Sequence, residues 1–176
     1  LCEEWEDLAL EAGSETPTRT AVMRIGMVLG RDGGALPQML NPVGFIKPFH
    51  WGLGGPLGDG SHFMAWVHIR DVVGMILYLL DRDLSGPFNL TAPNPVRNRE
   101  FTRTLGSVLN RPTLLPVPKF GLRLLYGEAV DVLYASQRVV PRRLQQAGYS
   151  FQFERINPAL AQLLQPGRPG AEPSYS

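Results

Sequence analysis

Ten consecutive residues with few polar side chains, 20–29 (TAVMRIGMVL), limit the folds open to this chain. A strand with one face in water alternates apolar and polar residues, whereas a strand covered by helices on both faces is apolar throughout. Residues 63–69 and 87–91 predict two further strands, and helical spacing of apolar residues predicts helices at 71–80 and 98–109. Strands that alternate with helices predict an α/β fold with a parallel sheet.

Helical spacing begins at the very first residues. It is formed by Cys2, Trp5, Leu8, Ala9 and Ala12, and no capping residue or turn precedes them. We therefore expect the chain to be the downstream piece of a longer protein. A fraying N-terminal helix is the alternative.

Glycine and proline punctuate the rest of the chain. Residues 51–61 (WGLGGPLGDGS) are too rich in glycine for the interior of a helix or strand and predict a hairpin or a flexible excursion. Beyond them we expect a strand at 149–153, a final helix capped by Asn157 and a disordered tail at 165–176. The other expected helices span residues 35–43, 119–126, 128–134 and 138–147.

Charge and cysteine content exclude several classes of function. Lysine plus arginine (17) nearly balances aspartate plus glutamate (16), so we expect neither nucleic acid nor a membrane as partner. The single cysteine excludes an internal disulfide and a site of several thiolates. The three histidines have no carboxylates at ligand spacing, so we expect no metal site.

Three segments together resemble a known family. They are residues 23–30 (MRIGMVLG), residues 66–71 (WVHIRD) and residues 118–149 (PKFGLRLLYGEAVDVLYASQRVVPRRLQQAGY). They resemble the C-terminal half of extended short-chain dehydrogenases/reductases, a group that includes nucleotide-sugar epimerases. The third is similar to the small C-terminal module of an epimerase-like subfamily without an assigned substrate, and the opening CEEWEDLALEA fits the same subfamily.

The resemblance implies the C-terminal half of a Rossmann-like, doubly wound parallel sheet in residues 1–112. A small, mostly helical substrate-side module would follow in residues 113–164. It further implies a cytoplasmic, NADP-dependent oxidoreductase or epimerase acting on a small molecule. The chain has no G-x-G-x-x-G turn, so the cofactor loop and catalytic tyrosine would lie outside it and the chain alone would be inactive. The alternative is a non-catalytic binding or regulatory module.

By the same resemblance, Ile25 and Gly26 would contact the cofactor and Met27 the substrate. These residues end a predicted strand, where open α/β sheets bind ligands. Plain packing at the strand end is the alternative. The glycine-rich segment 51–61 would act as a lid over the substrate.

Met64 departs from the pattern of nucleotide-sugar enzymes, in which an arginine at this position commonly holds a phosphate. Methionine offers no charge to a phosphate. Together with Trp66 and Met27, Met64 favours a more apolar substrate pocket and makes a nucleotide sugar less expected. The alternative is that these side chains belong to the core.

Three polar residues predict structural roles. Arg24 interrupts an apolar strand, and we expect a carboxylate beside the sheet to pair with it. His68 would tie its strand to the next loop through one hydrogen bond. Asp71 would cap the helix that follows.

Overall fold

The computed structural model describes residues 2–15, 17–42, 47–113, 115–117, 123 and 136–165. The expected helices at 119–126 and 128–134 and the expected disordered tail beyond residue 165 lie outside this part of the chain. The elements of the first half are α1 (Cys2–Ser14), β1 (Ala21–Ile25), β2 (Met27–Leu29), α2 (Ala35–Leu40), β3 (Phe63–Met64) and β4 (Trp66–His68). Those that follow are α3 (Ile69–Leu80), β5 (Gly86–Leu90), β6 (Val96–Arg97), α4 (Asn98–Leu109), α7 (Arg142–Gln146) and α8 (Ile156–Leu164).

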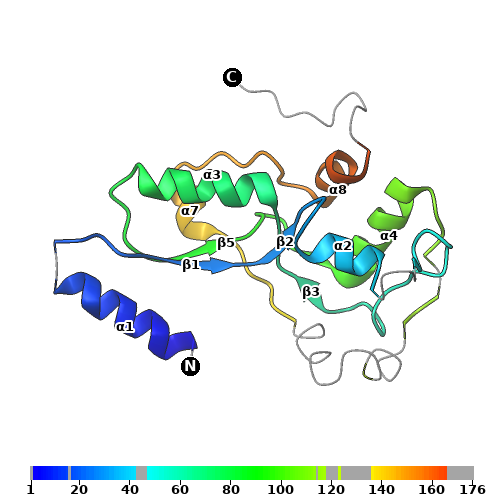
Figure 1. Cartoon of the computed structure of the whole chain (residues 1–176), viewed down its shortest axis with the longest axis horizontal. Coiled ribbons are helices and arrows are strands. Elements are labelled where there is room, and N and C mark those ends of the chain that lie inside the picture. Colours follow the sequence, from blue (N-terminus) through cyan, green and yellow to red (C-terminus); the bar gives the residue numbers. More distant parts are fainter. Residues whose placement is uncertain are drawn as a thin grey trace.

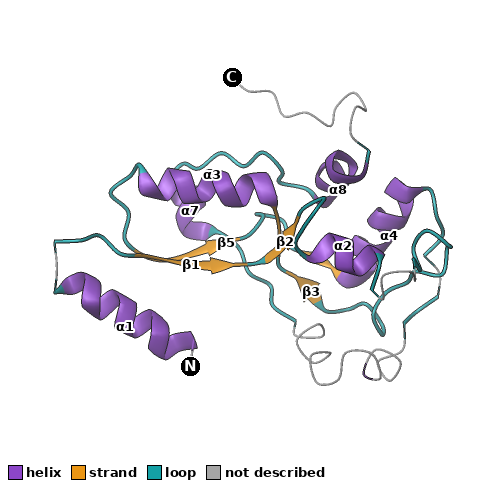
Figure 2. Cartoon of the chain, in the orientation of Figure 1, coloured by secondary structure: helices purple, strands orange, loops and turns teal. Residues whose placement is uncertain are grey.

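Strand pairing confirms the α/β class. β1 pairs in parallel with β5, and β2 pairs in parallel with β4, while β3 and β6 form a short antiparallel pair. Figure 1 shows α3 and α1 on opposite sides of the β1–β5 pair, and Figure 2 shows how helices surround the short strands. Parallel strands joined through helices and covered by them are the arrangement of a Rossmann-like fold.

The predicted strand at 20–29 is interrupted at Gly26. Its first part pairs with β5 and its second part with β4, so the chain changes neighbour at this glycine. The Gly26 N–H donates to the Leu90 carbonyl at 3.1 Å, and the Met27 N–H donates to the Ala65 carbonyl at 2.7 Å. A single continuous strand was the wrong prediction, because sequence pattern does not show which strand lies beside each half.

Burial of β1 also differs from the expectation. Met23 is 40% exposed and Ile25 is 51% exposed, and Arg24 between them is exposed as well. Within the described residues β5 is the one strand that pairs with β1, so one edge of β1 carries no strand partner. An uncovered edge explains how an apolar strand remains accessible.

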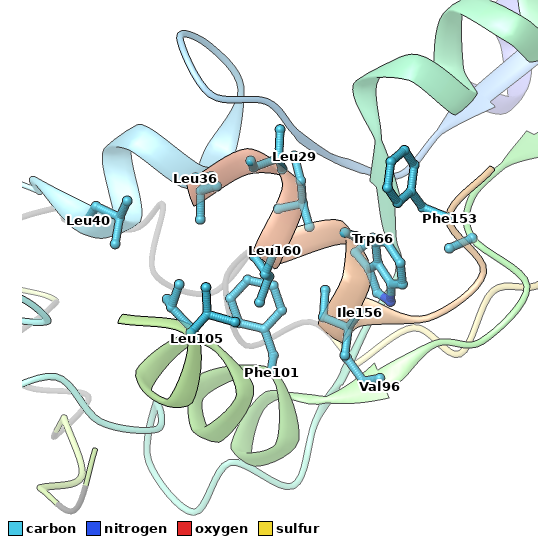
Figure 3. Packing of buried hydrophobic residues seen from close by; sticks show 14 of the residues in the cluster. Leu29, Leu36, Leu40, Trp66, Val96, Phe101, Leu105, Phe153, Ile156 and Leu160 are labelled. Carbon is cyan, nitrogen blue, oxygen red and sulfur yellow. The ribbon is translucent and has the colours of Figure 1, made fainter. Parts of the chain in front are cut away.

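Two clusters of buried side chains form the core. Figure 3 shows the larger cluster, in which α4 and α8 pack together around Phe101, Leu105 and Leu160 and reach Trp66 of β4. The smaller cluster joins α3 to β5 and α7 through Met75, Phe88 and other buried residues. α4 and α8 thus bury the apolar faces that their spacing predicts. The apolar face predicted for α1 is exposed instead, with Trp5 66% and Leu8 63% exposed, and Leu80 of α3 is 65% exposed.

The glycine-rich segment is packed, not a free lid. A Cβ on Gly55 would lie 1.5 Å from the Leu115 carbonyl oxygen, a distance no side chain can adopt. The Gly58 N–H donates to the Val117 carbonyl at 3.0 Å, and the Val117 N–H donates to the Pro56 carbonyl at 2.8 Å. The glycines therefore permit close contact between two backbone segments, which is a different use of glycine from flexibility.

Helix starts differ from the predicted caps. Arg97, one residue before Asn98, is the N-cap of α4, and Arg155 is the N-cap of α8 in place of Asn157. Residues 149–153 do not form a paired strand. They are held instead by hydrogen bonds to a buried side chain of α3 described below.

Candidate functional site

The carboxyl ends of β1 and β5 meet at one edge of the fold. Ile25 pairs with Leu90 at the last register position, and Gly26 and Thr91 come directly after these two residues. Because ligands of open α/β sheets bind outside the carboxyl ends of the strands, this edge is the candidate site.

Gly26 is in close contact with its neighbours. A Cβ at this position would lie 2.5 Å from the Ala65 carbonyl oxygen and 2.8 Å from the Thr91 methyl carbon Cγ2. The glycine is therefore required by packing between β1, β4 and the end of β5. Its backbone and the exposed Ile25 side chain remain the parts of this pair that a cofactor could contact.

Thr91 is a residue that sequence reasoning missed. It is 2% exposed, and its hydroxyl Oγ1 has no hydrogen-bond partner within the described structure. A buried hydroxyl without a partner is costly, and such groups concentrate at functional sites. The sequence signal was its position as the last residue of a predicted strand.

The three predicted substrate residues differ in accessibility. Met27 and Met64 are half-buried and pack against the larger core cluster. Trp66 is 0% exposed, and its indole N–H donates to the Asn94 carbonyl at 3.1 Å. Trp66 therefore presents no surface to a substrate in this structure, which differs from the predicted substrate contact, and its role here is that of a core residue.

Asn98 links Met64 to the glycine-rich segment. Its Oδ1 accepts the Leu57 N–H at 2.7 Å, and its Nδ2 lies 3.4 Å from the Met64 sulfur. The residue is 1% exposed. An asparagine before a helix usually predicts a cap, and the pattern could not show that its side chain is turned toward a loop 41 residues earlier.

Arg24 has the carboxylate partner that was expected. Its Nε donates to Glu6 Oε1 at 2.8 Å and to Oε2 at 3.0 Å, so α1 is joined to β1 by an ion pair. The Glu6 carboxylate raises the pKa of Arg24, and the guanidinium lowers the pKa of Glu6. The Arg24 side chain is 54% exposed, so the pair lies at the surface and not in a buried strand.

His68 is a helix cap and a tie between two parts of the chain. Its Nδ1 accepts the Arg70 N–H at 3.1 Å, which makes His68, and not Asp71, the N-cap of α3. Nε2 then carries the proton and donates to Gln162 Oε1 of α8 at 3.0 Å. The ring also stacks on Phe153, with centroids 3.9 Å apart.

Burial lowers the pKa of His68 to about 4, and the charge of Arg70 adds to this effect. The ring is therefore neutral at pH 7, as its role of acceptor at Nδ1 requires. A neutral ring with both nitrogens engaged supports the structural role that the sequence predicted.

Stability should depend on pH through His68. The unfolded chain takes up a proton on this ring below about pH 6.5, whereas the folded chain does so only near pH 4. Unfolding therefore binds a proton in this window, and the free energy of unfolding should fall by about 3 kcal/mol as the pH is lowered through it. Urea titrations at a series of pH values measure the effect. A His68→Asn variant keeps a capping acceptor and should lose this part of the slope; an unchanged slope would contradict the assignment.

Asp71 is buried in the first turn of α3. Its two carboxylate oxygens accept the backbone N–H groups of Gln152 at 2.8 Å and Phe153 at 2.9 Å. Burial raises the pKa of Asp71, while these two hydrogen bonds oppose the rise. The Tyr149 hydroxyl donates to the Asp71 backbone carbonyl at 3.3 Å, so the whole segment 149–153 is attached to α3.

The described residues were also expected to lack a metal site, and their helices bear on a membrane location. Within the described residues no group of three or more His, Cys, Asp or Glu side chains is placed to hold a metal ion. None of the helices in this part of the chain is long and apolar enough to span a bilayer.

Comparison with known proteins finds relatives over most of the chain. A protein-family profile described as "Domain of unknown function (DUF1731)" matches residues 117–163. An "Epimerase family protein SDR39U1 homolog, chloroplastic" of Arabidopsis thaliana is 43% identical over 166 residues, which are 94% of this chain and 46% of that protein. The chain spans about half the length of the relatives that it matches.

Two solved structures share the fold. The crystal structure of the human epimerase family protein SDR39U1 (isoform 2) with NADPH is 37% identical, with a TM-score of 0.77, over 87% of this chain and 52% of that chain. A nucleoside-diphosphate sugar epimerase from Corynebacterium glutamicum is 29% identical, with a TM-score of 0.65, over 91% of this chain and 29% of that chain.

Proposed function

We propose that the chain, which is similar to the C-terminal part of epimerase family proteins, forms the substrate-side part of an NADP-dependent oxidoreductase or epimerase of the extended short-chain dehydrogenase type. The observation that carries the proposal is the edge where β1 and β5 end side by side. It combines an exposed Ile25, a closely packed Gly26 and a buried Thr91 hydroxyl that has no hydrogen-bond partner among the described residues.

These residues fit the nicotinamide end of a dinucleotide. Ile25 offers an apolar surface for a flat ring, and Thr91 follows Leu90, the residue paired with Ile25. NADP would supply hydride transfer to or from a substrate carbon. This chain would contribute one wall of the substrate site, with Met27 and Met64 on it.

Binding of the cofactor's phosphates, and proton transfer, would come from residues outside this chain. The sequence contains no glycine-rich dinucleotide turn, and His68 is engaged at both ring nitrogens. We therefore expect the 176 residues alone to show no catalysis and at most weak dinucleotide binding. NADPH fluorescence on titration with the chain tests this; tight saturable binding would contradict it.

The longer reading frame gives the decisive experiment. If the frame upstream of Leu1 encodes a glycine-rich turn and a catalytic tyrosine, that protein should bind NADPH, and Ile25→Asp should weaken binding at least about tenfold. Met23→Asp is the matched control, since Met23 is exposed on the same strand but lies two residues before its end. Equal affinities of the two variants would argue against a cofactor contact at Ile25.

A further inference from the structure

Phe63 is in contact with two arginines that come from distant parts of the chain. Arg97 faces Phe63 across the β3–β6 pair, and its guanidinium carbon is 4.6 Å from the centre of the ring. The guanidinium carbon of Arg138, which lies just before α7, is 5.8 Å from the same centre. The two charges are therefore no more than about 10 Å apart.

Local structure holds both arginines in place. The Phe63 N–H donates to Ser136 Oγ at 3.0 Å, which attaches the segment carrying Arg138 to β3. Figure 1 shows this segment passing beside β3 on its way to α7. Arg97 also donates to the Ser61 carbonyl at 2.6 Å. Because strand residues alternate between faces, Phe63 and Arg97 lie opposite Met64 and Val96, which contact the core.

Neither guanidinium is neutralised within the described part of the chain. Among the described acids, Glu100 is the nearest to Arg97 along the chain and lies in the first turn of α4. Asp59, near Phe63 in sequence, accepts hydrogen bonds from the N–H and hydroxyl of Ser61. Arg99 and His62 lower the pKa of Asp59 further, so the Asp59 carboxylate interacts with those two side chains. Two cations on one aromatic ring without a carboxylate repel each other, and an oxyanion between them would remove that repulsion.

We propose that Arg97 and Arg138 form an anion-binding subsite for a phosphoryl or similar oxyanion group of the substrate. The subsite rests on the proposed function and refines the substrate class. Phe63 is two residues from Ala65, whose carbonyl accepts the Met27 N–H, so the backbone of Phe63 lies within about 7 Å of the Ala65 backbone beside the candidate site. The substrate would carry its anionic group away from the reacting carbon. Methionine at position 64, where related enzymes have an arginine, is then compatible with a substrate that carries one anionic group, because Arg97 and Arg138 would bind that group.

Inorganic phosphate is the probe for this subsite. Its dissociation constant is measured by phosphorus NMR with the full chain, at low salt and without cofactor. We expect Arg97→Gln and Arg138→Gln each to weaken binding at least about tenfold, and Arg97→Lys to weaken it less because charge remains while the planar guanidinium is lost. Arg103→Gln, which removes an exposed arginine of α4, is the matched control.

Either of two results overturns the subsite: unchanged phosphate binding in both variants, or an equal loss in Arg103→Gln. NADPH binding to the longer protein is measured separately. If the arginine substitutions leave phosphate binding unchanged while the longer protein binds NADPH, the subsite is contradicted and the proposed function is not. Phosphate binding at the two arginines without any NADPH binding contradicts the proposed function and leaves the anion site standing.

Discussion

Replacing Trp66 by alanine should lower the free energy of unfolding by about 4 kcal/mol, the loss that follows removal of a fully buried aromatic side chain. The indole is 0% exposed within the larger core cluster, and its N–H donates to the Asn94 carbonyl. The substitution leaves a cavity beside α8 and a carbonyl without its donor. Urea denaturation followed by circular dichroism measures the loss.

Trp51→Ala is the matched control, because Trp51 is 58% exposed in the glycine-rich segment. Its truncation should change stability by less than about 0.5 kcal/mol. If Trp66→Ala were as stable as the parent chain, the indole would not be a core residue, and the substrate contact predicted from the sequence would regain support.

The sequence was sufficient for the order and type of most elements. The helices at 69–80 and 98–109 bury one apolar face each, and this periodicity is written locally in the chain. The break at Gly26 is not local. It depends on β5 and β4 being the neighbours of the two halves, and those pairings join residues about 40 to 65 positions apart.

In the candidate site, too, some features follow from local sequence and others depend on distant residues. Arg24 was expected to pair with a carboxylate because a charged side chain in an apolar strand needs one, and Glu6 is that partner. Capping preference favoured Asp71, yet His68 caps α3. Asp71 instead serves two N–H groups 81 and 82 residues later, a relation that no local pattern records.

Asp71→Ala should be the most destabilising polar substitution in the described chain, with a loss of about 3 kcal/mol. It would leave the N–H groups of Gln152 and Phe153 without acceptors, and the Phe153 bond is buried. A buried donor that loses its acceptor costs about 1 to 3 kcal/mol. Denaturation in urea gives the loss, and amide hydrogen exchange locates it, since these two amides should exchange much faster.

Asp71→Asn separates the contribution of the two oxygens. The amide keeps one acceptor but turns an NH₂ group toward the other backbone N–H, so about half of the loss should remain. Asp81→Ala is the control, because Asp81 is exposed at the C-cap of the same helix, where a carboxylate is not favoured by the helix dipole. Full protection of the Gln152 and Phe153 amides in Asp71→Ala would show that the segment 149–153 is held by its aromatic contacts. The hydrogen bonds from this segment to Asp71 of α3 would then follow from the position of the segment and would not determine it.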